Sequence, residues 1–234
     1  MAKFFDLHIH TTKGSSDSNL TPEDLILEAS RIGLKGLCLT EHSGPWDRHE
    51  FEQFAQKHNV VLIRGMEVDT DFGHMLAFGM DKYESGYNNA ETLSKAVRAH
   101  GGFLISAHPF RGIFSPPGRG RPYLYKSPDD TIPTTADQAS QHHVFDMVDA
   151  IEAGNGGTAE NENLFALEVS QMLNLPVSGG SDAHSTHGLG NFATEFDTDI
   201  STEEEFIKAL RAGAFWPVHG LRQGSPKRFS LHKE

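Results

Sequence analysis

Histidine is unusually abundant in this chain, and several histidines lie where a short apolar segment ends. The chain has 234 residues, of which 14 are histidine. Histidine is the commonest metal ligand in proteins and titrates near neutral pH. His8 and His10 stand two residues apart at the end of one apolar segment, a spacing that lets both side chains reach the same ion if the segment is a strand. Metal chemistry is therefore the first hypothesis.

Later apolar segments carry the same signal. His42, Glu67, His108, Asp182 and His184 lie where segments end, and His74 begins the segment that follows Gly73. The carboxyl ends of strands in parallel sheets and barrels gather at one binding face, so the joint pattern is far more specific than a lone His-x-His. Imidazoles and carboxylates without thiolates suit Mn²⁺, Zn²⁺ or Fe²⁺. Asp6 and Glu41 lie beside this set, either as ligands or as partners that orient an imidazole.

The other histidines give a weaker signal. His187 follows the Asp182–His184 pair and touches either substrate or solvent. We expect the remaining seven to be surface or packing residues: His49, His58, His100, His142, His143, His219 and His232.

The elements that must position these residues alternate between strand-like and helical patterns. Residues 3–9 form a short apolar segment, a helix is expected to open at Thr21-Pro22 and to end at Gly33, and residues 36–40 form the next apolar run. Further strands are expected at 60–66, 74–78, 102–106, 150–153, 176–180 and 215–218, and further helices at 49–58, 89–100, 136–145, 159–173 and 203–212. Such alternation predicts a parallel α/β architecture, with a barrel favoured over an open sheet.

One stretch, residues 111–135, breaks this pattern. It holds five of the prolines and has neither a helical nor a strand period. A loop of this length is typical of a lid or binding segment, and it starts at the face where His108 ends its strand. Its arginines, Arg119 and Arg121, could grip a phosphate or simply face solvent. Elsewhere no linker is visible, so we expect residues 1–234 to form a single domain.

Composition limits the classes of function. The formal net charge is −12, so bulk electrostatics disfavour a protein that coats duplex DNA. The single cysteine, Cys38, excludes an intramolecular disulfide and a cysteine-based zinc knot. No apolar run reaches about 18 residues. We therefore expect a cytoplasmic protein without a membrane partner.

The motifs, taken together, resemble those of a known superfamily. They are Asp6-Leu-His8-Ile-His10-Thr, Thr40-Glu41-His42, Gly65-Met-Glu67, Ala107-His108-Pro109 and Gly180-Ser-Asp182-Ala-His184. In this order they resemble the PHP (polymerase and histidinol phosphatase) superfamily over residues 5 to about 190. The resemblance implies a distorted seven-stranded (β/α)7 barrel, two or three divalent ions in one site, and phosphoesterase activity.

The resemblance also implies a set of ligands. One ion would be held by His8, His10, Glu67 and Asp182, a second by Glu67, His74 and His108, and a third by Asp17, His42 and His184. A Glu-x-x-Asn segment lines the site in this superfamily, so the resemblance implies that Asn155 binds a substrate oxygen. From its position just after His108, Arg111 could grip a phosphate, and His187 touches substrate if it faces the site.

The function expected is hydrolysis of a phosphate ester by a metal-bound hydroxide, with no covalent intermediate on a side chain. The substrate would be a small phosphorylated metabolite, a nucleotide or a short nucleic-acid end. An amidohydrolase-like enzyme acting on a C–N bond is the alternative, because a His-x-His on the first strand also begins that class. A lysine at a strand end would support that alternative, and none is found there. A non-catalytic module is a third hypothesis, which the intact ligand set disfavours.

Overall fold

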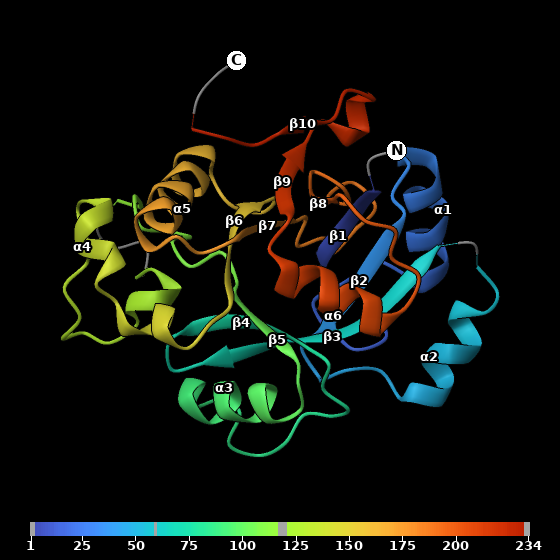
Figure 1. Cartoon of the computed structure of the whole chain (residues 1–234), viewed down its shortest axis with the longest axis horizontal. Helices are drawn as coiled ribbons and strands as arrows, with labels where there is room; N and C mark the ends of the chain where they lie inside the picture. The colour runs from blue at the N-terminus through green and yellow to red at the C-terminus, as the bar shows by residue number, and fades with distance from the viewer. Residues whose placement is uncertain (1–2, 59, 117–120, 232–234) are drawn as a thin grey trace.

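A strongly curled β-sheet forms the centre of the molecule, and helices cover its outer side (Figure 1). The computed structural model describes residues 3–58, 60–116 and 121–231, and within these ranges the sheet has ten strands in the order β10-β9-β8-β1-β2-β3-β4-β5-β6-β7. The strands are β1 (Lys3–Ile9), β2 (Gly36–Glu41), β3 (Val61–Thr70), β4 (Gly73–Phe78), β5 (Phe103–Ser106), β6 (Ala150–Asn155), β7 (Val177–Gly180), β8 (Phe192–Phe196), β9 (Phe215–His219) and β10 (Lys227–Arg228).

The sheet closes on itself where the chain leaves β7. The Asp182 backbone N–H donates to the His8 carbonyl at 2.8 Å, and the His10 N–H donates to the Ala183 carbonyl at 3.0 Å. Ile9 and Ala183 form a parallel bridge. The segment after β7 therefore shares one edge of β1 with β8, which pairs with the beginning of β1. The fold is a distorted barrel, as the sequence predicts. That residues 1–234 form a single domain stays a prediction.

Strand directions depart from the all-parallel expectation at β4. The pairs β1–β2, β2–β3, β5–β6 and β6–β7 are parallel, but β4 runs antiparallel to β3 and to β5. Only Asp71 and Phe72 separate β3 from β4, and a parallel crossover needs a dozen residues or more. β8 lies outside the strands expected from sequence, and it pairs antiparallel with β1 and β9.

The helices follow the expected segments closely. They are α1 (Pro22–Ile32), α2 (Arg48–Ala55), α3 (Ala90–Ala99), α4 (Ala136–Ser140), α5 (Glu160–Leu173) and α6 (Glu203–Ala212), with short 3₁₀ turns η1 (Tyr123–Tyr125), η2 (His143–Asp146) and η3 (Leu221–Gln223). Thr21 caps α1, and Gly33 ends it with a φ of 81°, as predicted. The helix expected at 136–145 is divided instead, because His142 has extended backbone angles and caps η2.

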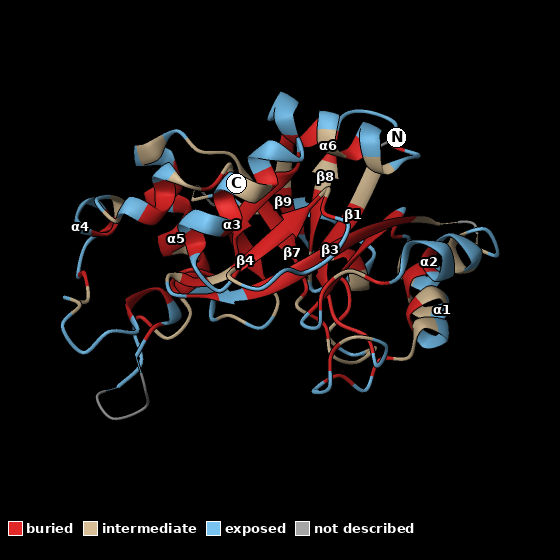
Figure 2. Cartoon of the chain, turned by 90° about the horizontal axis from the view of Figure 1, so that it is seen from below, coloured by how far each residue is buried: buried red, intermediate tan, exposed pale blue. Residues whose placement is uncertain are grey.

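Aromatic packing joins α6 to the barrel. Phe206 is fully buried, and its ring lies 5.2 Å from that of Phe78 and 5.9 Å from that of Phe196. The strands are buried nearly throughout while the helices expose their outer faces (Figure 2). No helix in the described part of the chain is long and apolar enough to cross a bilayer.

The stretch expected as a long loop is largely irregular in its described parts, residues 111–116 and 121–135, apart from η1. The sequence suggested that Arg119 grips a phosphate or faces solvent, and that His232 is a surface or packing residue. Both lie outside the described residues. Arg121 donates to the carbonyls of Tyr125 and Asp130, so its guanidinium stabilises the loop itself.

Candidate metal centre

The strand ends bring the expected ligands to one rim of the barrel. His8 lies in β1, His10 directly follows it, and His42, His108 and Asp182 follow β2, β5 and β7 closely. His74 lies at the beginning of β4 rather than at its end. Because β4 is antiparallel and pairs His74 with Asp69 of β3, its beginning lies at the same rim as Glu67. The reversed strand therefore completes the site.

The first cluster contains four side chains: His8, His10, Glu67 and Asp182. Glu67 Oε2 lies 3.3 Å from His8 Nε2 and 3.2 Å from His10 Nε2. Asp182 Oδ1 lies 3.5 Å and 3.3 Å from the same two nitrogens. Both Nε2 atoms are buried without a hydrogen-bond partner among the described residues. Two buried nitrogens that converge with two carboxylate oxygens fit a divalent cation, because an unpaired buried polar atom is otherwise costly.

The opposite nitrogens of these rings are occupied, which orients the lone pairs. His8 Nδ1 lies 3.0 Å from Glu152 Oε1, and His10 Nδ1 lies 3.1 Å from Ser15 Oγ. A proton held on Nδ1 leaves Nε2 as a lone pair directed at the cluster. Ser15 donates in turn to Glu41 at 2.7 Å, so Glu41 orients His10 through Ser15.

Among the described residues, Asp6 belongs to none of the metal clusters and is not hydrogen-bonded to an imidazole, the two roles that the sequence suggested for it. Its carboxylate accepts from the backbone N–H groups of Ser181 at 2.8 Å and Gly190 at 3.1 Å. It therefore stabilises the joint between β1 and the segment after β7, and its described hydrogen bonds do not include an imidazole. Burial raises the pKa of Asp6 to about 6, against the hydrogen bonds from Ser181.

The second cluster shares Glu67 with the first. Its Oε1 atom lies 2.8 Å from His74 Nδ1 and 3.0 Å from His108 Nε2. Oε1 thus faces His74 and His108, whereas Oε2 faces the separate pair His8 and His10 and also has His42 Nδ1 at 3.4 Å. That arrangement suits a carboxylate that bridges two cations.

The third cluster is more open to solvent. Asp17 Oδ2 lies 3.2 Å from His184 Nε2 and 3.5 Å from His42 Nε2. His184 Nδ1 lies 3.0 Å from the Asp182 carbonyl, which leaves Nε2 free to ligate. His10 joins His42 and His184 within ligand distance of one another. The structure therefore brings together all the residues of the expected set, with His10 between the first and third clusters.

Carboxylates and imidazoles in the first two clusters shift one another's pKa values. Although burial alone would raise it, the pKa of Glu67 is held well below its usual range by His8 and by the other imidazoles around it. Asp182 behaves alike, since His8 and His10 lower its pKa against burial. Burial lowers the pKa of His108, which favours its neutral form. The pKa of His8 is raised well above its usual value, because the surrounding carboxylates outweigh its burial. A bound divalent ion would replace the proton on His8, since an imidazole ligand is neutral.

Glu152 and Asn155, both on β6, support the site from one side. Glu152 is 1% exposed, contacts His8 through both oxygens, and accepts from the His108 backbone N–H at 3.0 Å. Glu152 was not among the residues expected from sequence. Its signals in the sequence were a carboxylate inside an otherwise apolar strand and its position three residues before Asn155.

Arg111 faces the same region. Its guanidinium donates to Asn155 Oδ1 at 2.7 Å, to Thr158 Oγ1 at 3.0 Å and to Asp182 Oδ2. The Asn155 side chain is fully buried and also donates to Glu152 at 2.9 Å. Arg111 is partly exposed beside the first cluster, where it could reach a substrate oxygen. Substrate binding by these two residues stays a prediction.

His187 is exposed on the loop after β7, and no hydrogen bond or ion pair joins it to another described residue. Its role as a substrate contact stays a prediction. Of the six described histidines that were not expected to be ligands, none belongs to the clusters.

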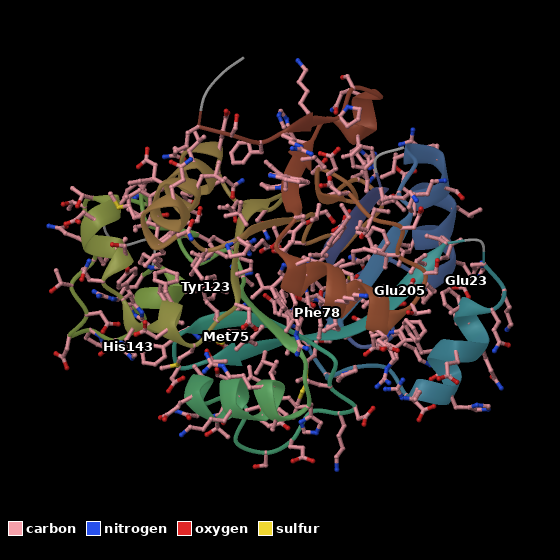
Figure 3. The ribbon with its side chains drawn as sticks, viewed as in Figure 1. Glu23, Met75, Phe78, Tyr123, His143 and Glu205 are labelled. Carbon is pink, nitrogen blue, oxygen red and sulfur yellow. The ribbon has the colours of Figure 1, made fainter. Side chains whose placement is uncertain are left out.

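Tyr123 of η1 is a site residue that the sequence analysis missed. Its ring centroid lies 4.6 Å from that of His74 and 6.0 Å from that of His108. Figure 3 shows it near Met75 of β4. Gly73, which lies beside the Tyr123 backbone, has a φ of 86°, a conformation that favours glycine in the tight turn between β3 and β4. Lys126 anchors the loop to Asp69.

Two ligand positions have unusual backbone angles. His108 has a φ of 30° and Asp182 a φ of 55°, in the left-handed region that residues other than glycine rarely adopt. Such conformations persist where surrounding contacts impose them, and they are common at functional sites.

Comparison with known proteins agrees with this site. Residues 6–111 match the PHP domain family, and residues 160–215 match the PHP-associated family that accompanies it. The first match contains the candidate ligands from His8 to His108, and the second contains Asp182 and His184. The chain therefore belongs to the PHP family, as the motifs predict.

Relatives by sequence cover only parts of the chain. The error-prone DNA polymerase of Mycobacterium tuberculosis is 35% identical over 65 residues, which are 28% of this chain and 6% of the polymerase. The 5′-3′ exoribonuclease of Haemophilus influenzae is 30% identical over 102 residues, which are 42% of this chain and 36% of that protein. The chain thus spans a small part of these relatives.

Solved structures share the fold across most of the chain. A protein of Bifidobacterium adolescentis, named as a candidate metal-dependent phosphoesterase, has a TM-score of 0.61 at 17% identity and covers 90% of this chain and 96% of its own. An amidohydrolase of Chromobacterium violaceum has a TM-score of 0.59 at 16% identity and covers 88% and 96%. The lesion-specific endonuclease of Pyrococcus furiosus has a TM-score of 0.59 at 22% identity and covers 91% and 56%. At these identities the likeness establishes the fold alone.

Proposed function

We propose that this protein is a metal-dependent phosphoesterase that hydrolyses a phosphate ester of a small metabolite, a nucleotide or an oligonucleotide end. The observation that carries the proposal is Glu67, whose two oxygens face two different pairs of imidazoles. A shared carboxylate of this kind would hold two ions close together. Two or three Mn²⁺, Zn²⁺ or Fe²⁺ ions would bind at the three clusters.

Divalent ions, when bound, lower the pKa of water and neutralise phosphoryl oxygens. The chain supplies the rest of the site. His8 and His10 are held by Glu152 and Ser15 so that Nε2 points inward. Arg111, fixed by Asn155 and Thr158, would donate to a phosphate oxygen from the open side. The partners would be small phosphorylated molecules or short nucleic-acid ends, and a cytoplasmic location stays a prediction from the sequence.

A lysine among the candidate ligands would support the C–N hydrolase alternative. No lysine of the described residues forms a hydrogen bond or ion pair with a residue of the three clusters. The phosphoester hypothesis is favoured for that reason and because of the family match.

The test combines metal analysis with a substrate panel. We expect purified protein loaded with Mn²⁺ to hydrolyse p-nitrophenyl phosphate or bis-p-nitrophenyl phosphate, and not N-acyl amino acids. Glu67→Gln should bind at least one ion fewer and lose activity by about 10²-fold or more, because both pairs of imidazoles lose a shared anion. Circular dichroism would confirm that the variant is folded. Unchanged metal content in Glu67→Gln, or hydrolysis of amides only, would exclude the proposal.

A further inference from the structure

A groove with a volume of about 950 Å³ lies between the beginning of α5 and the strands β8, β9 and β10. Its lining includes Thr158, Glu160, Phe192, His219, Lys227 and Phe229. Neither the metal clusters nor the motifs of the sequence use these side chains, apart from the bond between Thr158 and Arg111.

Strand register places an aromatic and cationic row on one face of this groove. His219 of β9 is paired with Phe192 of β8 on one side and with Lys227 of β10 on the other. Directly paired residues project to the same face of a sheet, as does Phe229, two residues after Lys227. The Phe229 ring lies 5.1 Å from that of Phe192 and 6.0 Å from that of His219.

The groove opens at the same rim as the metal clusters. β8 runs antiparallel to β1 with Phe5 opposite Thr194, so Phe192 lies toward the end of β1 that carries His8. On the opposite wall, Thr158 accepts from Arg111, which also donates to Asp182. Two consecutive hydrogen bonds therefore connect the wall of the groove to a candidate metal ligand.

The charge of the groove distinguishes its sheet side from its helix side. Lys227 is exposed and has no ion pair with another described residue. Arg228 is engaged away from this row, because its guanidinium lies 3.6 Å from the Trp216 ring centroid and pairs with Glu195. Glu160 is exposed on the helix side. A ligand with a flat ring and an anionic group would thus place its anion beside Lys227.

We propose that this groove binds a nucleobase of the substrate, stacked on the His219 ring with the Phe229 ring against its edge, because these two rings are nearly perpendicular, with Lys227 contacting the adjoining phosphate. Base stacking on aromatic side chains suits every base, and stacking combined with a cation is the usual means of binding single-stranded nucleic acid. The proposal rests on the phosphoesterase function. Among its possible substrates it selects nucleotides and oligonucleotide ends over small phosphorylated metabolites.

The test is calorimetric binding of two probes to the full chain in EDTA, where hydrolysis cannot occur. One probe is a 5′-phosphorylated adenine dinucleotide, and the other is the same backbone with both bases removed. We expect the adenine probe to bind about tenfold or more tightly than the abasic one. His219→Ala should abolish that difference, and Lys227→Gln should weaken both probes alike. Lys208→Gln, which removes an exposed lysine of α6 outside the lining of the groove, should leave the ratio unchanged.

Equal or undetectable binding of both probes would overturn the proposal, as would an unchanged ratio in His219→Ala. Hydrolysis separates this result from the proposed function. If no phosphoester is hydrolysed but binding depends on the bases, the groove stands and the phosphoesterase proposal fails. If phosphoesters are hydrolysed and the probes bind alike, the groove alone fails.

Discussion

At the scale of single residues, the contacts of both polar atoms in a candidate ligand side chain matter to the site. Glu67 divides its two oxygens between two clusters, and His8 and His10 use Nδ1 for support and Nε2 for the cluster. Such supporting contacts typically change metal affinity by 10–100-fold when removed. The third cluster is more exposed and has fewer such supporting contacts. Substitutions of its candidate ligands are therefore the most informative about whether an ion binds there.

Asp17→Ala and His184→Ala should each remove the same single ion. Their side chains lie 3.2 Å apart, and both lie outside the buried clusters that Glu67 joins. We expect metal analysis to show one ion fewer per chain in each variant and similar kinetic defects. Asp129→Ala, an exposed acid in the Pro/Gly-rich stretch, is the matched control. Full metal content in Asp17→Ala would show that Asp17 is only a loop residue.

At the scale of elements, segments between the strands add residues to the candidate site and change the course of the chain beside it. The stretch between β5 and α4 carries Tyr123 to the rings of His74 and His108, and His142 divides the following helical segment. Tyr123 lies in the short turn η1 and His142 caps the short turn η2, so neither residue belongs to a strand or an α-helix. Each gives a prediction that concerns its segment rather than the barrel.

Tyr123→Ala should impair large substrates more than small ones. The ring is 40% exposed and lies over two candidate ligands, so it would contact the leaving group of a large phosphoester. We expect KM for such a substrate to rise roughly tenfold, the equivalent of one aromatic contact, with metal content unchanged. Tyr83→Ala, at 41% exposed, is the control. Equal KM changes for p-nitrophenyl phosphate and the large ester would refute this role.

His142 should make folding stability depend on pH. Burial, with His143 beside it, lowers the pKa of His142 to about 4, below its value of about 6.5 in the unfolded chain. The neutral ring, whose Nδ1 accepts from the Val144 N–H at 3.2 Å, is therefore favoured by folding. Its contribution is complete above pH 6.5 and is lost as the pH falls toward 4.

The comparison is between wild type and His142→Asn, because asparagine can accept the same backbone hydrogen bond without titrating. Between pH 7.5 and 5.0, wild type should lose about 1 kcal/mol more stability than the variant, or roughly 2–4 °C more in Tm. Thermal denaturation of both proteins at both pH values measures this. Equal losses of stability in the two proteins would show that His142 does not cause the pH dependence.

At the scale of the whole molecule, the clusters tie together strands that are distant in sequence. Ligands come from β1, β3 and β4 and from the segments after β2, β5 and β7, so bound ions would connect most of the barrel rim. Glu67 and Asp182 place two buried carboxylates in one cluster, so a bound cation would interact favourably with both charges. Metal binding should therefore stabilise the fold as well as the site.

Removing metal with EDTA should lower Tm, and restoring it should raise Tm. Mn²⁺ at 100 times its dissociation constant should add about 2.7 kcal/mol per ion bound to the folded state alone, which corresponds to roughly 5–10 °C for a chain of this size. Differential scanning fluorimetry measures the change. Glu67→Gln should show a smaller increase. The same Tm with and without metal would mean that the clusters do not bind ions in the folded protein.

The sequence by itself determined the class of fold and the residues that make the rim. Strand-length apolar runs and capped helices are local patterns, and every candidate ligand except Asp17 lies next to a run, so their order along the chain already favours a barrel with a shared face. His8, Glu67 and Asp182 could be selected on this ground alone.

Only the tertiary structure decided which atoms meet. The direction of β4, the closure of Ala183 on Ile9, the support from Glu152 and the approach of Tyr123 all depend on contacts between residues far apart in sequence. The Phe192–His219–Lys227 row likewise exists only through strand pairing. Local propensity is read along the chain, whereas these contacts form across strands, where register and side-chain packing choose the partners.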